Sequence, residues 1–171
     1  PTAPVAQPES VKHISSQDDF MYMNVKDASN YYVLDNDIVI DDEWFFGPTG
    51  ELNCTFDGQG HTIKGLYVST NAENTYASGL FAQLTGSAVV QNVTVTGYIY
   101  VHGVGGGNVG GIAGEANGAA IRNCRNLCDI RLNKVDGSLG GVQINTGGIA
   151  GSSSGTIENC RNDGPLRTIA P

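Results

Sequence analysis

Two stretches of the sequence decide the fold. Residues 110–124 read GGIAGEANGAAIRNC, and residues 147–160 read GGIAGSSSGTIENC. A third copy reads SGLFA from Ser78 and VQNV from Val90. Each copy consists of a short apolar strand, a polar turn and a second short strand. The first strand recurs after 32 and 37 residues (79 to 111 to 148), and self-similarity at a nearly fixed period is typical of a repeat protein.

The equivalent strands follow one another in the same sense, so we expect them to stack in parallel, about 4.8 Å apart, and to bury one face. The first apolar residues of the second strands then form an inward column: Ile63, Val90, Ile121 and Ile157. Three residues later a second column follows: Leu66, Val93, Cys124 and Cys160. Stacked amides mark a bend between the two columns: Asn92, Asn123 and Asn159. The sequence therefore predicts an all-β protein, a single right-handed parallel β-helix of about four coils.

The regions outside the repeats complete this organisation. Residues 1–12 hold three of the six prolines and are predicted to be a flexible linker. Residues 13–167 form the β-helix, and a short helix from Ser16 to Asp27 covers its N-terminal end, because Ser16 is a good N-cap and Phe20 and Met23 share one face. Residues 168–171 are expected to be a truncated C-terminal end, beyond which the native protein continues.

Composition and charge exclude several classes of protein. Glycine makes up 24 of 171 residues and charged residues only 15%, which is unlike a helical bundle or a coiled coil. The net charge is −8, and residues 1–73 carry 12 acids against 3 bases. This balance argues against nucleic-acid binding, which needs concentrated Lys and Arg. No apolar run approaches the roughly 20 residues of a membrane helix, so we expect no membrane insertion.

Two motifs carry a family resemblance. The segment FDGQGHTIKGL at residues 56–66 resembles one that is common in bacterial secreted β-helix proteins. The later copies, GGIAG followed by I-x-N-C, resemble the GLUG motif repeat, although Ala82 replaces the usual glycine in the first copy. The resemblance covers about residues 14–166. It implies a large exported protein anchored at a bacterial surface, and it is specific for architecture rather than for function.

The candidate ligand-binding residues are aromatic residues and two arginines at equivalent positions of the repeat. Trp44, Tyr98 and Tyr100 supply rings on which a sugar can stack, with Phe45 and Phe46 beside Trp44. Arg125 and Arg161 follow the repeated I-x-N-C motif at the same position, so we expect them to lie in line on the outer face.

Acidic residues and histidines offer weaker candidates. The carboxylates of Asp35, Asp37, Asp41 and Asp42 are a calcium candidate by ligand type, but the loop lacks the EF-hand pattern, and solvated strand ends are the better interpretation. His61 lies near Asp57 inside the resembled motif, where a structural turn is favoured over an acid–base pair. We therefore predict no metal site, no cofactor and no catalytic residue.

The four cysteines leave two readings open: Cys54, Cys124, Cys128 and Cys160. An even count in an exported protein suggests disulfides, and Cys124 and Cys160 are expected one coil apart, a spacing that a disulfide tolerates. The same column holds apolar residues in other coils, so buried free thiols are equally natural and are the favoured reading.

Three functions compete. The first is a non-catalytic module of a larger bacterial surface or secreted protein, extracellular, acting in adhesion, interaction or as a spacer. The second is a carbohydrate-binding module, and the third is a polysaccharide-active β-helix enzyme, which needs paired carboxylates or a base beside a cation on one outer face. We expect host or environmental glycans or proteins as partners, and a monomeric state for the isolated chain.

Overall fold

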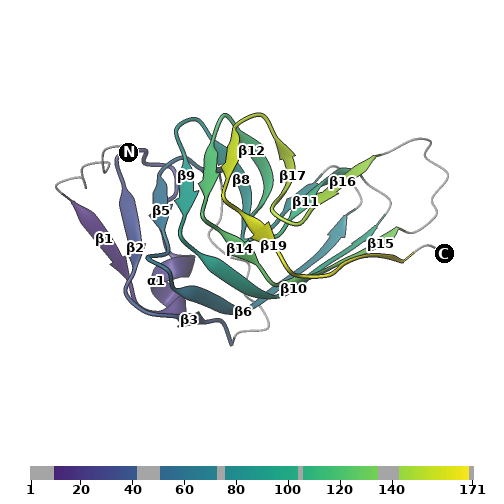
Figure 1. Ribbon diagram of the computed structural model, residues 1–171, viewed down its shortest axis with the longest axis horizontal. Helices are drawn as coiled ribbons and strands as arrows, with labels where there is room; N and C mark the ends of the chain where they lie inside the picture. The colour runs from purple at the N-terminus through teal and green to yellow at the C-terminus, as the bar shows by residue number, and fades with distance from the viewer. Residues whose placement is uncertain (1–9, 42–50, 73–75, 104–105, 135–142, 170–171) are drawn as a thin grey trace.

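The computed structural model describes residues 10–41, 51–72, 76–103, 106–134 and 143–169, and within them the protein is all-β with parallel sheets and one short helix (Figure 1). A six-stranded sheet contains β1 (Val11–Ile14), β2 (Tyr31–Leu34), β5 (Thr55–Asp57), β9 (Val89–Gln91), β13 (Ala120–Arg122) and β18 (Thr156–Glu158). A seven-stranded sheet contains β3 (Ile38–Val39), β6 (Thr62–Ala72), β10 (Thr94–Gly103), β14 (Arg125–Asn126), β15 (Asp129–Lys134), β19 (Arg161–Asn162) and β20 (Leu166–Ile169).

Two smaller sheets complete the architecture. The four-stranded sheet contains β4 (Glu51–Leu52), β8 (Phe81–Thr85), β12 (Ala113–Asn117) and β17 (Ala150–Ser153). The three-stranded sheet contains β7 (Tyr76–Ser78), β11 (Gly107–Gly110) and β16 (Ile144–Gly147). From β5 onward the chain visits the six-, seven-, three- and four-stranded sheets in that order and then begins again. We call each such circuit a pass.

Registers between passes confirm part of the expected columns and correct the rest. Val90, Ile121 and Ile157 lie opposite one another, as expected. Ile63 does not join them, because Val90 pairs with Phe56 instead, and Ile63 lies opposite Val95 in the seven-stranded sheet. The motif I-x-G-L matched I-x-N-C only through two apolar residues three positions apart. That spacing comes from a bulge at Gly65 in β6 and from the asparagine bend in the later copies.

Leu66 is also outside its expected column. It lies opposite Gly97 in β10, whereas Val93 and Cys124 immediately precede the paired residues Thr94 and Arg125. The pass that contains β5 therefore supplies its equivalent strand at residues 55–57, where Phe56 lies seven residues before Ile63, the residue that the repeat pattern suggested.

The asparagine bend is confirmed. Asn92, Asn123 and Asn159 have φ values of 54°, 51° and 52°, a left-handed conformation that asparagine tolerates better than most residues. Each lies between a strand of the six-stranded sheet and one of the seven-stranded sheet. The side chain of Asn123 donates from Nδ2 to Oδ1 of Asn92 at 3.2 Å, so the amides bond along the stacking direction.

The N-terminal helix is shorter than predicted. α1 spans Gln17–Met21 rather than residues 16–27, with Ser16 as N-cap in a capping box with Asp19. Its Phe20 is fully buried and packs edge-on against Phe56 and Phe81, with ring centroids 5.7 and 5.9 Å away. The helix thus packs against the core through Phe20, and β1 extends into the predicted linker at Val11.

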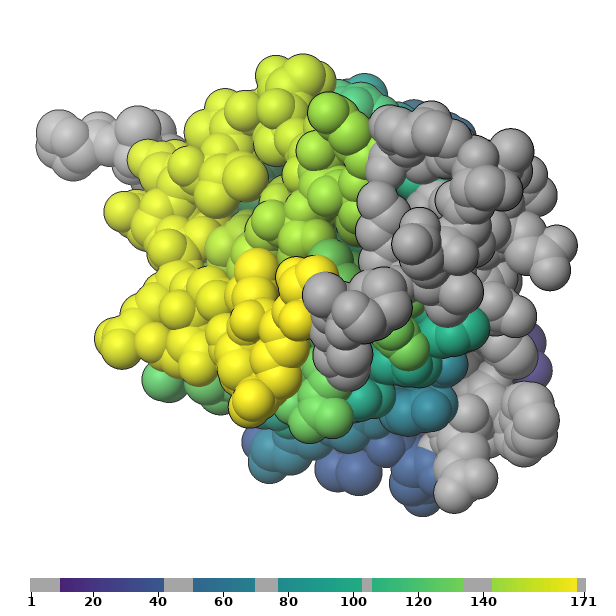
Figure 2. All heavy atoms as spheres, turned by 90° about the vertical axis from the view of Figure 1, so that its right-hand side faces the viewer, coloured from purple at the N-terminus to yellow at the C-terminus, as the bar shows by residue number. Residues whose placement is uncertain are grey.

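The last pass is exposed at the opposite end. β16, β17, β18, β19 and β20 each form an edge of their sheet within the described residues. The last pass makes up much of the surface in Figure 2, in yellow-green and yellow. Ile157, expected in the core, is 44% exposed, because no described strand covers its outer side.

Candidate functional site

One outer face of the seven-stranded sheet gathers aromatic side chains. Along β10, Ile99 and Val101 point into the core and are at most 2% exposed. The alternate residues Tyr98, Tyr100 and His102 are half-buried on the outer face, because successive side chains of a strand point to opposite sides. Their common face is therefore set by the apolar residues between them.

A fourth ring joins from the preceding pass. Tyr67 of β6 lies opposite Tyr98, and it is 43% exposed. We call Tyr67, Tyr98, Tyr100 and His102 the aromatic row. The centroid distances are 6.0 Å for Tyr67–Tyr98, 6.1 Å for Tyr98–Tyr100 and 6.3 Å for Tyr100–His102, with interplanar angles of 11°, 16° and 31°. The tyrosine rings are nearly parallel, and nearly parallel rings at these distances are laterally offset, whereas the ring of His102 is tilted against that of Tyr100. Each ring therefore leaves part of its surface uncovered by the next.

Polar side chains of the next pass border the aromatic row. The guanidinium of Arg131 lies over the ring of Tyr98, 5.1 Å from the centroid, a cation–π contact. Asn133 donates from Nδ2 to the hydroxyl of Tyr100 at 3.2 Å. These contacts fix two of the rings and place hydrogen-bonding groups beside them.

Two arginine pairs lie on the same sheet, each sharing one carboxylate. Arg125 and Arg161 are opposite one another, and both donate from Nε to Asp163 at 2.6 Å. We call these two residues the first arginine pair. Hydrogen bonds from Arg125 lead the interactions that hold the pKa of Asp163 below its usual value, so this carboxylate is ionised at neutral pH.

The second arginine pair consists of Arg131 and Arg167, which are also opposite one another. Arg131 Nη2 lies 2.8 Å and Arg167 Nε 3.4 Å from oxygens of Asp129. The hydrogen bond from Arg131 is the main cause that lowers the pKa of Asp129. Both pairs therefore combine two positive charges with one negative charge.

The structure brings together some of the predicted ligand-binding residues. Tyr98 and Tyr100 are neighbours in the aromatic row, and Arg125 and Arg161 form the first arginine pair, but no contact joins the two groups among the described residues. Trp44 lies in residues 42–50, outside the described part of the chain.

Sequence reasoning missed Tyr67, His102, Arg131 and Arg167. His102 continues the alternation of Tyr98 and Tyr100, a signal that was available. Arg131 and Arg167 lie six residues after Arg125 and Arg161, respectively, which the repeat also offered.

Asp57 and His61 do not form an acid–base pair in this structure. Asp57 is 4% exposed and accepts hydrogen bonds from Tyr31, Gln91, Asn92 and the backbone of Gln59. Burial alone would raise the pKa of Asp57, but these hydrogen bonds stabilise the carboxylate and lower the pKa overall. This carboxylate acts as the first member of the ladder that continues through Asn92 and Asn123.

Two of the acidic residues considered for calcium contact basic side chains. Asp35 contacts His13 at 2.6 Å, and Asp37 contacts Lys64 at 2.7 Å and His61 at 3.5 Å. Of the other two candidates, Asp41 lies within the part of the chain that the structure describes, and Asp42 lies outside it. Within the described ranges, no group of three or more His, Cys, Asp or Glu side chains is placed to hold a metal ion.

All four cysteines are free thiols, the favoured of the two readings. Burial raises the pKa of Cys54 to about 11 and the pKa values of Cys124 and Cys128 to about 12. Cys160, in the last pass, is only half-buried. Three of the thiols are therefore protonated core residues at neutral pH.

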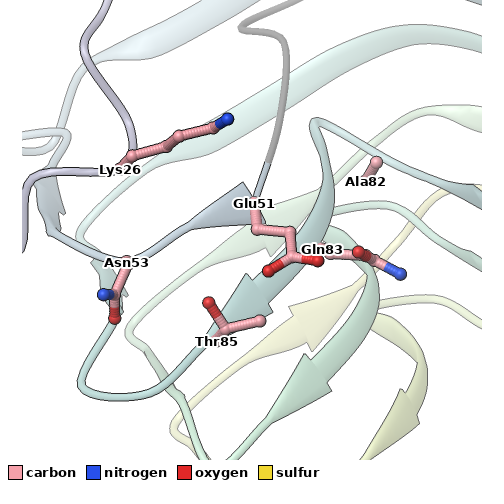
Figure 3. A pocket seen from close by; sticks show the side chains of 6 residues that line it. All are labelled: Lys26, Glu51, Asn53, Ala82, Gln83 and Thr85. Carbon is pink, nitrogen blue, oxygen red and sulfur yellow. The ribbon is translucent and has the colours of Figure 1, made fainter.

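A separate open hollow of about 660 Å³ lies beside β4 and β8 (Figure 3). Polar and small side chains line it: Lys26, Glu51, Asn53, Ala82, Gln83 and Thr85. Gln83 lies opposite both Glu51 and Glu115, and it donates to Glu115 at 3.2 Å. None of these described residues is aromatic, whereas four rings lie side by side on the seven-stranded sheet, which is therefore the candidate binding face.

No protein-family model, curated protein or solved structure matches the chain. No helix among the described residues is long and apolar enough to cross a membrane.

Proposed function

We propose that the four sheets are the faces of one right-handed parallel β-helix of about four coils, of the GLUG type that the sequence resembles. Two observations support this proposal. Every strand pairing among the described residues is parallel, and successive passes visit the sheets in the same order. A stack of such coils buries one continuous core between its faces, in agreement with the fully buried Val90 and Ile121 in consecutive passes.

The function that this geometry supports best is glycan binding by a non-catalytic, extracellular module of a bacterial surface protein. The aromatic row is the observation that carries the proposal. Offset rings on a rigid sheet present apolar surface to the C–H faces of sugars, while Asn133 and Arg131 beside them offer donors to sugar hydroxyls. The family resemblance supports the extracellular, bacterial location.

The state of the carboxylates favours binding over hydrolysis. A glycosidase needs one carboxyl group with a raised pKa as general acid. On the sheet that carries the aromatic row, the arginines lower the pKa of Asp129 and that of Asp163, so both are ionised and serve as structural anions. Asp57 is likewise held as a carboxylate by four donors.

A glycan-array screen with the purified chain tests the proposal. We expect binding to a defined set of glycans and a loss of about tenfold or more in Tyr98→Ala, because stacked rings contribute on the order of 1 kcal/mol or more each. Tyr22→Ala is the matched control, since Tyr22 is 78% exposed at the C-cap of α1 and does not belong to the seven-stranded sheet. Glycan binding that is unchanged in Tyr98→Ala, or no binding to any glycan, would overturn the proposal.

A further inference from the structure

We propose that the ligand of this face is an acidic glycan, and that the two arginine pairs bind its carboxylate or sulfate groups. The inference rests on the proposed glycan binding and specifies its substrate class. It follows from the chemistry of the arginines, which the aromatic row alone does not explain.

The carboxylates fix the orientation of the guanidinium groups but do not occupy all of their N–H donors. Arg125 and Arg161 each contact Asp163 through Nε, and among the described residues their Nη atoms have no partner. Arg161 and Arg167 have side chains that are 73% and 58% exposed. A guanidinium has five N–H donors in a planar fork, so the free Nη donors can make bidentate contacts with an anionic ligand.

Local charge agrees with an anionic ligand. All five arginines of the chain lie between residues 122 and 167, although the whole protein has a net charge of −8. Each arginine pair combines two positive charges with one negatively charged carboxylate and therefore has a net charge of about +1. Because the pKa values of Asp163 and Asp129 are lowered, the arginines stay held in position under mildly acidic conditions.

The spacing of the pairs indicates a chain-like ligand with few charges. Arg125 and Arg131 are six residues apart, as are Arg161 and Arg167, and six extended residues span at most about 20 Å. A polysaccharide that lies along the strands meets one pair, then the other, with the aromatic row beside the second. Nucleic acid carries far denser charge, which the acidic remainder of this protein would repel.

The experiment compares acidic glycans with neutral counterparts that have the same backbone. The probes are polygalacturonate against its methyl ester, heparin against desulfated heparin, and single-stranded DNA as an unrelated polyanion, each measured by calorimetry at two salt concentrations. We expect at least one acidic glycan to bind about tenfold more tightly than its neutral counterpart, with weaker binding at high salt.

Substitutions then assign the effect to the arginines. Arg161→Gln and Arg167→Gln should each remove most of the preference for the acidic form. Lys64→Gln is the matched control, because Lys64 is also half-exposed and ion-paired, with Asp37. A circular-dichroism melt confirms that each variant remains folded, as expected for surface sites.

The outcomes separate this inference from the proposed function. Equal binding of acidic and neutral forms that is lost in Tyr98→Ala overturns the acidic ligand and leaves glycan binding standing. A preference that survives both arginine substitutions also overturns the inference. Binding of DNA as tight as that of the acidic glycans changes the partner class and overturns it. Absence of binding to every probe and every glycan of the array overturns both proposals.

Discussion

The two ends of the stacked strands differ in how completely they bury large apolar side chains. At the N-terminal end, α1 places Phe20 over the core, and Phe56 and Phe81 beneath it are at most 2% exposed. At the other end, Ile157 occupies the position of Ile121 in the next pass but is 44% exposed. Burial in a repeat architecture is thus a property of position in the stack, since each repeat is covered only by its neighbours.

The largest expected difference in stability is between two variants that place a carboxylate at equivalent positions of consecutive passes, Ile121 and Ile157. Ile121→Asp should unfold the protein, because it places an unpaired carboxylate in a fully buried site. Ile157→Asp should leave a cooperative thermal transition, since water already reaches this side chain. Circular-dichroism melts of both variants check the difference. Equal loss of structure would show that the two ends are packed alike.

Removing the ring that closes the N-terminal end should have the next largest effect. Phe20→Ala is expected to lower the free energy of unfolding by about 3–5 kcal/mol, the usual cost of emptying a phenylalanine site. Tyr22→Ala, two residues along the same segment but exposed, should change it by no more than about 0.5 kcal/mol. Urea titrations measure both values, and a small effect of Phe20→Ala would contradict the assigned role of α1.

The buried carboxylate of Asp57 should make the early passes sensitive to acid. Its pKa is lower in the folded protein than in the unfolded chain, so its contribution to stability is complete above the unfolded value of about 3.9 and is lost as the pH falls further. Asp57→Asn, which places an amide among four donors, should cost about 1–3 kcal/mol at pH 7. In urea titrations, the difference in the free energy of unfolding between the unsubstituted protein and Asp57→Asn should be smaller at pH 3 than at pH 7. A difference that stays constant would contradict the role assigned to the Asp57 carboxylate.

The smallest effect concerns thiol reactivity rather than stability. Iodoacetamide should modify Cys160 of the exposed pass before Cys54, Cys124 or Cys128, because the reagent attacks the thiolate. Burial disfavours the thiolate in Cys124, with a pKa of about 12. Mass spectrometry of peptides at increasing reaction times gives the order. Modification of Cys124 as early as Cys160 in the folded protein would show that the last pass does not differ from the one before it.

The later passes could be predicted from the sequence because their chemistry repeats residue by residue. The pairing of Ile121 with Ile157, the asparagine bend and the alignment of Arg125 with Arg161 all follow from the copies of I-x-N-C. The early pass could not be predicted in this way, since Phe56 and Asp57 stand where later passes have Val90 and Gln91. Alternation of apolar residues alone gives no register between such different strands.

The candidate site was predicted in part for a similar reason. Tyr98 and Tyr100 lie two residues apart on one strand, so the sequence places them on one face. Tyr67 joins them only through an irregular register between β6 and β10. The end of the helix was also not evident, because Met23 and Val25 are buried and continue the apolar pattern of α1 beyond its last residue, Met21.

That irregular register has a consequence for how the binding face can change during evolution. Ile63 and Leu66 of β6 pair with Val95 and Gly97 of β10, so β6 holds one extra residue, at a bulge where Gly65 has a φ of 77°. Because successive side chains of a regular strand alternate between faces, this extra residue lets Ile63 and Leu66 both point inward although they are three positions apart. Its deletion would restore regular pairing, with Leu66 still opposite Gly97 and inward and Tyr67 still opposite Tyr98 and outward. The loss of this one codon from the gene would therefore spare the aromatic row, and related sequences that bind the same ligand can differ by one residue at the bulge while they keep an aromatic residue directly after the position of Leu66.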